Sequence, residues 1–173
     1  MDIRQIITEI KEMNTVFERP EGRGADREQE FSYFLEERGE LQKEWVLLWD
    51  LIWTLDALVD ICVFAVGALH KDGRSTEEIV RLVQWSWWID IRTITTSSQY
   101  QQSSASILKS TLETLIALVW ESTMIALFHE VYLSNMSKLK DGKPIPGNLP
   151  WKFGKNMDTY FKPDLKRVLW QCL

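Results

Sequence analysis

Three aspartates interrupt the most apolar stretch of the chain, and they constrain its fold more than any other feature. The stretch runs from Trp45 to Leu69 and is long enough to cross a bilayer, but Asp50, Asp56 and Asp60 lie within it. A carboxylate at the centre of a membrane is costly, and three in one helix make a bilayer a poor environment for it. We therefore expect a buried helix of a soluble protein with no membrane partner, whose carboxylates find a metal ion or a bound ligand.

Composition and charge exclude several classes of protein. The chain has 173 residues, of which 45% are hydrophobic and 26% charged, which predicts a single globular domain over residues 1–173. With 20 basic and 25 acidic residues the net charge is −5, so a nucleic-acid polymer is not an expected partner. Cys62 and Cys172 form no CxxC motif, and no secretory signal opens the chain, so we expect a cytoplasmic protein.

Apolar residues recur at helical spacing through most of the chain, and no segment alternates convincingly with period two. The pattern predicts a first helix that begins near Ile3 and ends before Pro20, and further helices over about residues 26–45, 51–70, 75–89 and 107–133. The Ser-, Thr- and Gln-rich segment 93–106 is expected to be a loop or a frayed helix end. Prolines and glycines beyond Lys140 predict an extended tail. The expected fold class is all-α, with a helical body over residues 1–140 and a Pro/Gly-rich tail over 141–173.

Acidic side chains line one stripe of the second predicted helix. They are Glu36, Glu37, Glu40 and Glu44. Asp56 and Asp60 are one turn apart on the next helix, and a short turn near residues 47–50 would place them opposite the glutamates. The glutamates alone would also suit the solvated face of a surface helix. Asp56 and Asp60 lie in an apolar segment where bare charge is costly, so together the two helices favour a site for Mg²⁺ and a phosphate substrate.

Several motifs in order along the chain resemble the MazG-like all-α nucleoside triphosphate pyrophosphohydrolases of phage and bacterial type. Glu36-Glu37-x-x-Glu40 matches the first acidic motif of that family, and Asp56 and Asp60 lie in the region of the second. Further similar segments are Ser134-Asn135-Met136-Ser137-Lys138, Gly142-Lys143-Pro144 and Pro163-Asp164-Leu165. The resemblance implies helical hairpins forming a four-helix-bundle-like core of the MazG type.

The same resemblance implies an enzyme that hydrolyses (deoxy)nucleoside triphosphates to the monophosphate and pyrophosphate, with Mg²⁺ as cofactor. Carried over by position, the metal ligands would be Glu37, Glu40, Asp56 and Asp60. Glu36 would be the catalytic residue that orients or deprotonates the attacking water. Asn135 and Lys138 would bind the phosphates of the substrate.

The chain departs from the family pattern in its second acidic motif. That motif has a glutamate three residues before its aspartate, but Trp53 stands there relative to Asp56, and Ala57 relative to Asp60. Two substitutes for the missing glutamate remain open. Either Asp50, one turn earlier, takes its place, or Asp56 and Asp60 together replace the glutamate–aspartate pair of the motif. The alternative function is a helical scaffold that has lost catalysis and serves in oligomerisation or ligand binding.

Tryptophans are unusually frequent, with nine in the chain. Trp45, Trp49 and Trp53 repeat every four residues beside the acidic stripe, which indicates a core or a subunit interface. A functional interpretation makes Trp53 a substrate-binding residue that stacks on the nucleobase. Because short helical hairpins bury their apolar faces on a copy of themselves, we expect a homodimer or homotetramer.

Overall fold

The computed structural model describes residues 3–17, 27–43, 50–147 and 154–172. Within these ranges the chain forms seven α-helices, one short 3₁₀ helix and no strands, which confirms the all-α prediction. The elements are α1 (Arg4–Phe17), α2 (Arg27–Lys43), α3 (Leu51–Lys71), α4 (Thr76–Trp85), η2 (Ile91–Thr93), α5 (Ser97–Leu118), α6 (Glu121–Met136) and α7 (Leu165–Cys172).

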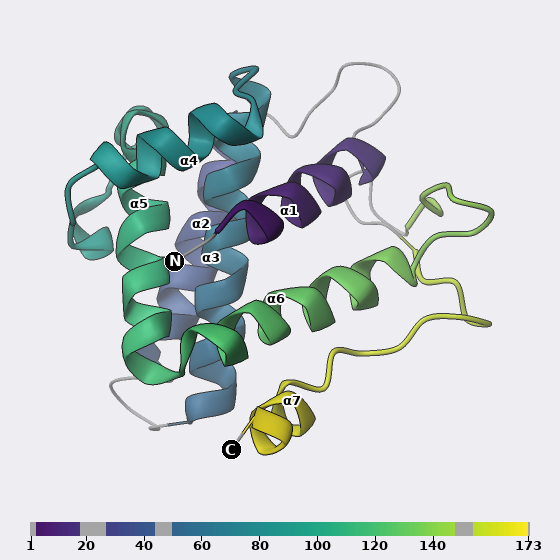
Figure 1. Ribbon diagram of the computed structural model, residues 1–173. Helices are drawn as coiled ribbons and strands as arrows, with labels where there is room; N and C mark the ends of the chain where they lie inside the picture. The colour runs from purple at the N-terminus through teal and green to yellow at the C-terminus, as the bar shows by residue number, and fades with distance from the viewer. Residues whose placement is uncertain (1–2, 18–26, 44–49, 148–153, 173) are drawn as a thin grey trace.

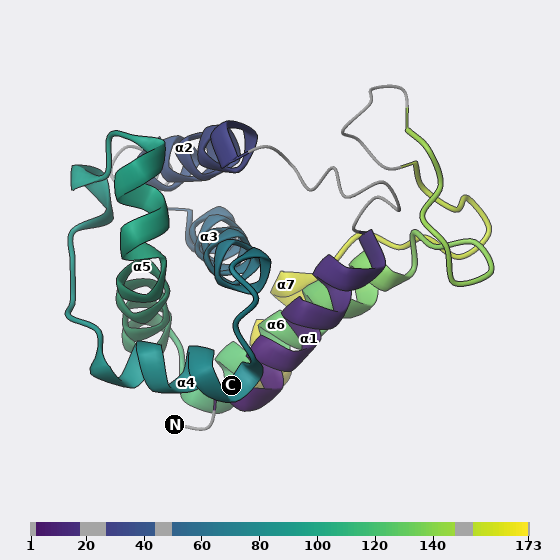
Figure 2. The same cartoon turned by 90° about the horizontal axis from the view of Figure 1, so that it is seen from above.

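Helix α3 is the centre of the structure. It packs against α2 and α5 on one side, and α1 and α7 also contact it. In Figure 1 the helices α2, α3 and α5 stand upright, while α1 and α6 cross them side by side. Seen from above, α3 lies between α2 with α5 and the stacked pair of α1 and α6 (Figure 2). Most of the α3 side chains are therefore buried.

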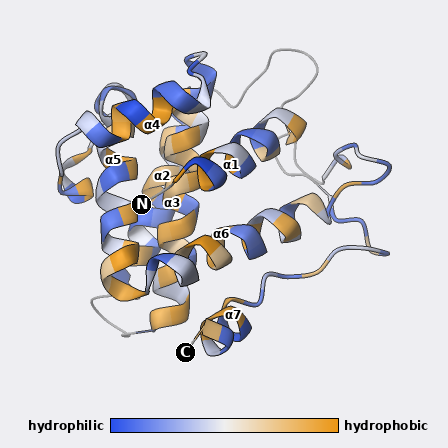
Figure 3. Cartoon of the chain, in the orientation of Figure 1, coloured by the Kyte–Doolittle hydropathy of each residue, from blue (hydrophilic) through white to orange (hydrophobic). Residues whose placement is uncertain are grey.

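The apolar character of α3 follows from this central place. By length and composition α3 could cross a membrane, but 61% of its most apolar window is buried within the protein. Figure 3 shows hydrophobic residues concentrated along α3, whereas the surrounding helices alternate more between hydrophobic and hydrophilic residues. Leu55, Leu58 and Ile61 are fully buried, so removing any of them would leave a cavity in the core.

Local side chains set several of the helix boundaries. Asp50 caps α3 by accepting hydrogen bonds from the backbone N–H groups of Ile52 (3.0 Å) and Trp53 (3.2 Å). Ser75 and Glu78 form a capping box at the start of α4. The helix α4 ends at Trp85 rather than near Ile89, because the backbone of Ser86 is extended. The turn predicted near residues 47–50 lies mostly outside the described residues, as do Glu44, Trp45 and Trp49.

The prediction for residues 93–106 was wrong, because α5 begins at Ser97. Thr96 and Gln99 form a capping box that starts this helix. Its polar residues are accommodated inside the core by local bonds: Ser104 Oγ donates to the carbonyl of Tyr100, and Thr111 Oγ1 to that of Ile107, both at 2.8 Å. Satisfied in this way, serine and threonine occupy buried positions that an apolar pattern does not reveal.

The single helix predicted over 107–133 was also wrong. The chain turns by 116° between α5 and α6, at Val119 and Trp120, whose backbones are extended. Both helices bury apolar residues, so each packs on a different part of the core. The corner carries neither glycine nor proline, and nothing in the local sequence marks it.

The C-terminal tail is extended only as far as α7. Residues 154–164 form turns and irregular backbone, and Leu165–Cys172 is helical. The carboxylate of Asp164 accepts a hydrogen bond from the backbone N–H of Arg167 at 2.9 Å and so starts the helix. Leu165, Val168 and Leu169 then bury one face of α7, mainly against α6.

Candidate metal and phosphate site

The carboxylates of α2 and α3 lie along the seam where these two helices pack. Glu36, Glu37 and Glu40 belong to α2, and Asp56 and Asp60 to α3. Their charges act on one another across the seam: Asp60 and Asp56 raise the pKa of Glu37, and Glu40 raises that of both aspartates. The four residues expected to bind metal therefore interact electrostatically along this seam. We call Glu37, Glu40, Asp56 and Asp60 the acidic cluster.

Burial and mutual repulsion disfavour the charged form of this cluster. Burial is the largest cause that raises the pKa of Glu37 to about 8, followed by the charges of Asp60 and Glu40. Burial, reinforced by Asp56, raises the pKa of Asp60 to about 7. The pKa of Asp56 is raised by burial and by Glu40, while Lys162 lowers it. When no cation is bound, ionisation of one of these carboxyl groups disfavours ionisation of the others.

Glu36 lies at the outer edge of the cluster. Its side chain is exposed, and its charge contributes to the raised pKa of its neighbour Glu37. An exposed carboxylate beside a metal cluster can reach a water molecule that a buried one cannot. The catalytic assignment of Glu36 remains a prediction.

Trp53 and Asp50 have roles that the sequence left open. Asp50 is engaged as the N-cap of α3 through its Oδ1, so the helix start already uses one of its oxygens. The ring of Trp53 is 49% exposed, and the Nζ of Lys162 lies 5.4 Å from its centroid. This is within the range of a cation–π interaction. Of the two substitutes, the pair of Asp56 and Asp60 is the one coupled to the glutamates of α2.

Asn135 and Lys138 lie at the end of α6 and are bonded to each other. The Nζ of Lys138 donates to Oδ1 of Asn135 at 2.5 Å, while the amide of Asn135 donates to the carbonyl of Val131 at 3.1 Å. Burial lowers the pKa of Lys138, and the charge of Asp60 opposes this, so the lysine faces the acidic cluster. Ser137, not Asn135, caps the helix.

Two further lysines near the cluster were missed by sequence reasoning. Lys162 acts on Asp56, and Lys155 lowers the pKa of Lys138 by repulsion. Both come from the segment between residues 154 and 164, which follows the α6 end in Figure 1. They are about a hundred residues from the aspartates along the chain, so no spacing rule could place them there.

The donor set of the acidic cluster fits Mg²⁺ in its chemistry. Carboxylate oxygens are the ligands that this ion prefers, and a divalent cation would offset the burial and mutual repulsion that raise the pKa values of Glu37 and Asp60. Within the described residues, however, no three histidine, cysteine, aspartate or glutamate side chains are arranged to hold one metal ion. Mg²⁺ is commonly bound by one or two carboxylates together with substrate phosphates and water. The cluster therefore suits a Mg²⁺ ion that binds together with the phosphates of the substrate.

A separate cavity lies between α2, α3, α5 and the segment before α5. It has a volume of about 290 Å³, and its apolar lining includes Leu41, Leu58 and Ile91. Leu58 lies two residues from each aspartate, about 200° around α3 from each, whereas Leu41 lies one turn after Glu37 on α2. The residues that line the cavity include none of the acidic cluster.

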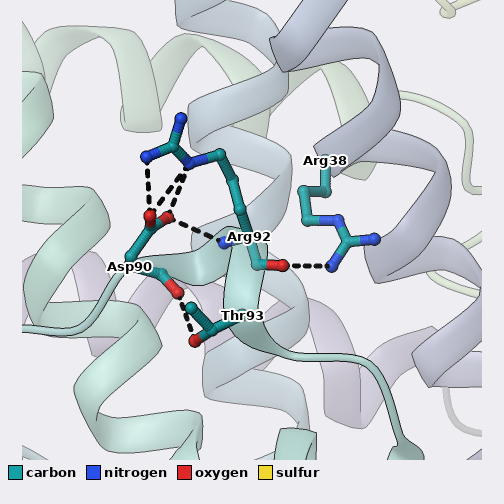
Figure 4. Close-up of polar contacts among 4 residues, drawn as sticks. All are labelled: Arg38, Asp90, Arg92 and Thr93. Atoms are coloured by element: carbon teal, nitrogen blue, oxygen red, sulfur yellow. Dashed lines mark hydrogen bonds and ion pairs between the residues drawn. The ribbon is translucent and has the colours of Figure 1, made fainter.

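Arg38 closes one side of this cavity and ties α2 to the segment before α5. Its Nη1 donates to the backbone carbonyls of Ile94 (2.5 Å) and Arg92 (3.4 Å). Figure 4 shows Arg38 beside this segment, where Arg92 pairs with Asp90 at 2.6 Å. Since Arg38 follows Glu37 directly, these bonds fix this part of α2 against the segment before α5.

No protein-family model, curated protein or solved structure matches this chain.

Proposed function

We propose that the chain is a Mg²⁺-dependent nucleoside triphosphate pyrophosphohydrolase of the MazG-like class, releasing the nucleoside monophosphate and pyrophosphate. The observation that carries the proposal is the acidic cluster at the α2–α3 seam, with the ammonium group of Lys138 facing Asp60. The four-helix-bundle-like core of the MazG type is part of this proposal. So are the cytoplasmic location and the nucleotide substrate.

The chemistry needs a water molecule to attack the α-phosphorus. The oxygen of the water bonds to this phosphorus, and the bond to the oxygen that bridges to the β-phosphorus breaks, so that oxygen leaves with the electron pair. Glu36 would orient the water and accept its proton. Glu37, Glu40, Asp56 and Asp60 would hold Mg²⁺, which neutralises phosphate charge and makes the phosphorus more electrophilic.

Lys138 and Asn135 would bind the phosphates from the end of α6. Their mutual hydrogen bond orients the ammonium group, and a compact charge suits phosphate oxygens. Stacking of the nucleobase on Trp53 is supported by the exposure of its ring. The large exposed tryptophans elsewhere, among them Trp85, Trp87 and Trp120, support a homodimer or homotetramer.

The second candidate is a non-catalytic scaffold that binds a ligand or assembles with copies of itself. Two observations favour it: Trp53 occupies the position of the expected glutamate, and no three potential ligands in the described part of the chain are arranged around one metal position. Turnover separates the two candidates.

The test is pyrophosphate release from a panel of ribo- and deoxyribonucleoside triphosphates, with Mg²⁺ and with a chelator. The enzyme should lose activity at least a hundredfold in Glu40→Gln and in the chelator, because the metal loses a ligand or is removed. The matched control is Glu113→Gln, an exposed glutamate on α5, which should retain full activity. A folded protein that releases no pyrophosphate from any nucleotide would refute the enzyme and favour the scaffold.

A further inference from the structure

Two lysines from the C-terminal part of the chain act on the acidic cluster, and a third lies near one of them. Lys138 acts on Asp60, Lys162 acts on Asp56, and Lys155 acts on Lys138; we call the three the lysine rim. In the part of the chain that the structure describes, none of them forms an ion pair with a carboxylate. Each is held instead by a neutral group: Lys138 by Asn135, Lys155 over the ring of Tyr160 at 4.4 Å, and Lys162 over the ring of Trp53.

The segment that carries Lys162 is fixed on both sides of it. The carbonyl of Phe161 accepts a hydrogen bond from Ser134 Oγ at 2.9 Å, and its N–H donates to Ser137 Oγ at 3.3 Å. Two residues after Lys162, the N–H of Asp164 donates to Glu130 at 3.0 Å. The backbone of Lys162 is thus anchored to α6, so a ligand that binds there loses little free energy in ordering this segment.

A substrate at the acidic cluster would need these cations. A nucleoside triphosphate carries several negative charges, and the four carboxylates repel it. A metal ion between carboxylates and phosphates offsets part of this repulsion. Ammonium groups without carboxylate partners, next to the aspartates, can offset the rest. They would also stabilise the charge that develops on the leaving pyrophosphate.

We infer that Lys155 and Lys162 join Lys138 to bind the pyrophosphate part of the substrate, and that Trp53 is a positioning residue that holds Lys162 in place. The inference rests on the proposed function, since it locates the leaving group of that reaction. It gives one face of the Trp53 ring a role in addition to the nucleobase stacking proposed above. A tryptophan at residue 53 keeps an ammonium group beside Asp56 without placing a further carboxylate there.

Inorganic pyrophosphate with Mg²⁺ is the probe, and calorimetric titration into the intact chain is the measurement. Lys162→Met should weaken pyrophosphate binding at least tenfold, because a charge-assisted contact to phosphate is lost. Lys162→Arg should recover most of the affinity. The matched control is Lys166→Met on α7, an exposed lysine four residues further on, which should bind as the wild type does.

Two results would overturn the inference: no pyrophosphate binding to the wild type, or an affinity of Lys162→Met within twofold of the wild type. Failure of the proposed function is distinguishable. A chain that binds pyrophosphate through Lys162 but never hydrolyses a nucleotide would refute the enzyme and keep the lysine rim. A chain that hydrolyses nucleotides with Lys162→Met unaffected would keep the enzyme and refute the rim.

The role of Trp53 has its own comparison. Trp53→Leu removes the aromatic face beneath Lys162 and should weaken pyrophosphate binding about threefold, whereas Trp53→Phe keeps a ring and should restore it. A thermal melt of both variants accompanies the titrations. Equal weakening in both variants, or a loss of affinity that only follows a loss of stability, would contradict the positioning role.

Discussion

Tyr100 is buried in the aromatic cluster between α2 and α5. Its side chain is 1% exposed, and its ring centroid lies 4.9 Å from that of Phe34. Among the described residues, the hydroxyl oxygen has no hydrogen-bond partner, and burial together with the charge of Glu30 raises its pKa far above the ordinary value. Packing of the ring stabilises the folded protein, whereas the buried hydroxyl group destabilises it.

Tyr100→Phe should therefore stabilise the protein by about 0.5–1.5 kcal/mol, because the unpaired hydroxyl is removed and the ring packing is kept. Chemical denaturation of the two proteins measures the difference. Tyr132→Phe is the comparison, since the Tyr132 hydroxyl is bonded to Glu12 and its removal should bring no gain. A destabilised Tyr100→Phe variant would show that the hydroxyl has a partner in solution.

Glu37 should make stability depend on pH when no divalent metal is present. Its pKa rises from 4.5 in an unfolded chain to about 8 in the folded one, so the folded state binds more protons between these values. The free energy of unfolding therefore falls as pH rises from about 5 to 8. After allowance for solvent screening we expect a loss of roughly 1–2 kcal/mol.

Glu37→Gln should flatten this dependence, because glutamine does not titrate. In a chelator at pH 8.5 the variant should be more stable than the wild type, and at pH 5 the two should be alike. Denaturation curves at both pH values measure this, with Glu113→Gln expected to follow the wild type. Parallel pH profiles for wild type and Glu37→Gln would contradict the raised pKa.

At the scale of elements, the ion pair of Glu130 and Arg167 joins α6 to α7. Glu130 is 7% exposed, and its Oε2 accepts from Arg167 Nη2 at 2.8 Å while Oε1 accepts from the N–H of Asp164. Glu130→Ala should cost about 1–3 kcal/mol, because both donors lose their acceptor.

The loss of stability in Glu130→Ala should affect α7 before it affects the whole protein. Hydrogen exchange should show faster exchange of the α7 amides in Glu130→Ala, with α3 unchanged at low denaturant. Glu113→Ala on the exposed face of α5 is the control. Unchanged protection of α7 would mean that its apolar face alone keeps it docked.

The elements that the sequence predicted well are those with a strong apolar period and a visible cap. The apolar period marks α1, while α3 and α4 also have Asp50 and Ser75 at their starts. The start of α5 was missed because Ser104, Ser110 and Thr111 are buried there, bonded locally, in place of apolar residues. The helix α7 was missed because prolines and glycines dominate the tail before it.

The candidate site was likewise predicted only in part from the sequence. Offsets of three and four residues placed the carboxylates of α2 and α3 on facing surfaces, because helix geometry fixes which side chains share a face. Lys155 and Lys162 could not be placed, because their position depends on how the tail packs against α6. Contacts between segments far apart in sequence are set by tertiary packing, which periodicity does not describe.

At the scale of the whole molecule, large aromatic side chains remain uncovered. Trp85 and Trp87 are 84% and 83% exposed, Trp120 is 76% and Trp170 is 70% exposed. Exposed apolar groups of this size are typical of surfaces that bind another protein. The homo-oligomer we propose would cover some of them.

Light scattering at micromolar concentration should therefore give a mass of two or four times the 20.3 kDa of one chain. Replacing Trp87 and Trp120 together by serine should shift the mass toward one chain, with the helical content unchanged. The single replacements show which tryptophan matters more. A wild-type protein that stays at 20.3 kDa would contradict association.

The number of residues along α6 fixes the direction from which Lys138 approaches Asp60. Each residue added to a helix turns the following side chains by about 100°, so one residue inserted or deleted within Glu121–Met136 would rotate Lys138 away from Asp60. No residue of the acidic cluster or the lysine rim would change. The length of α6 is therefore as specific a requirement for the site as the charges that it brings together.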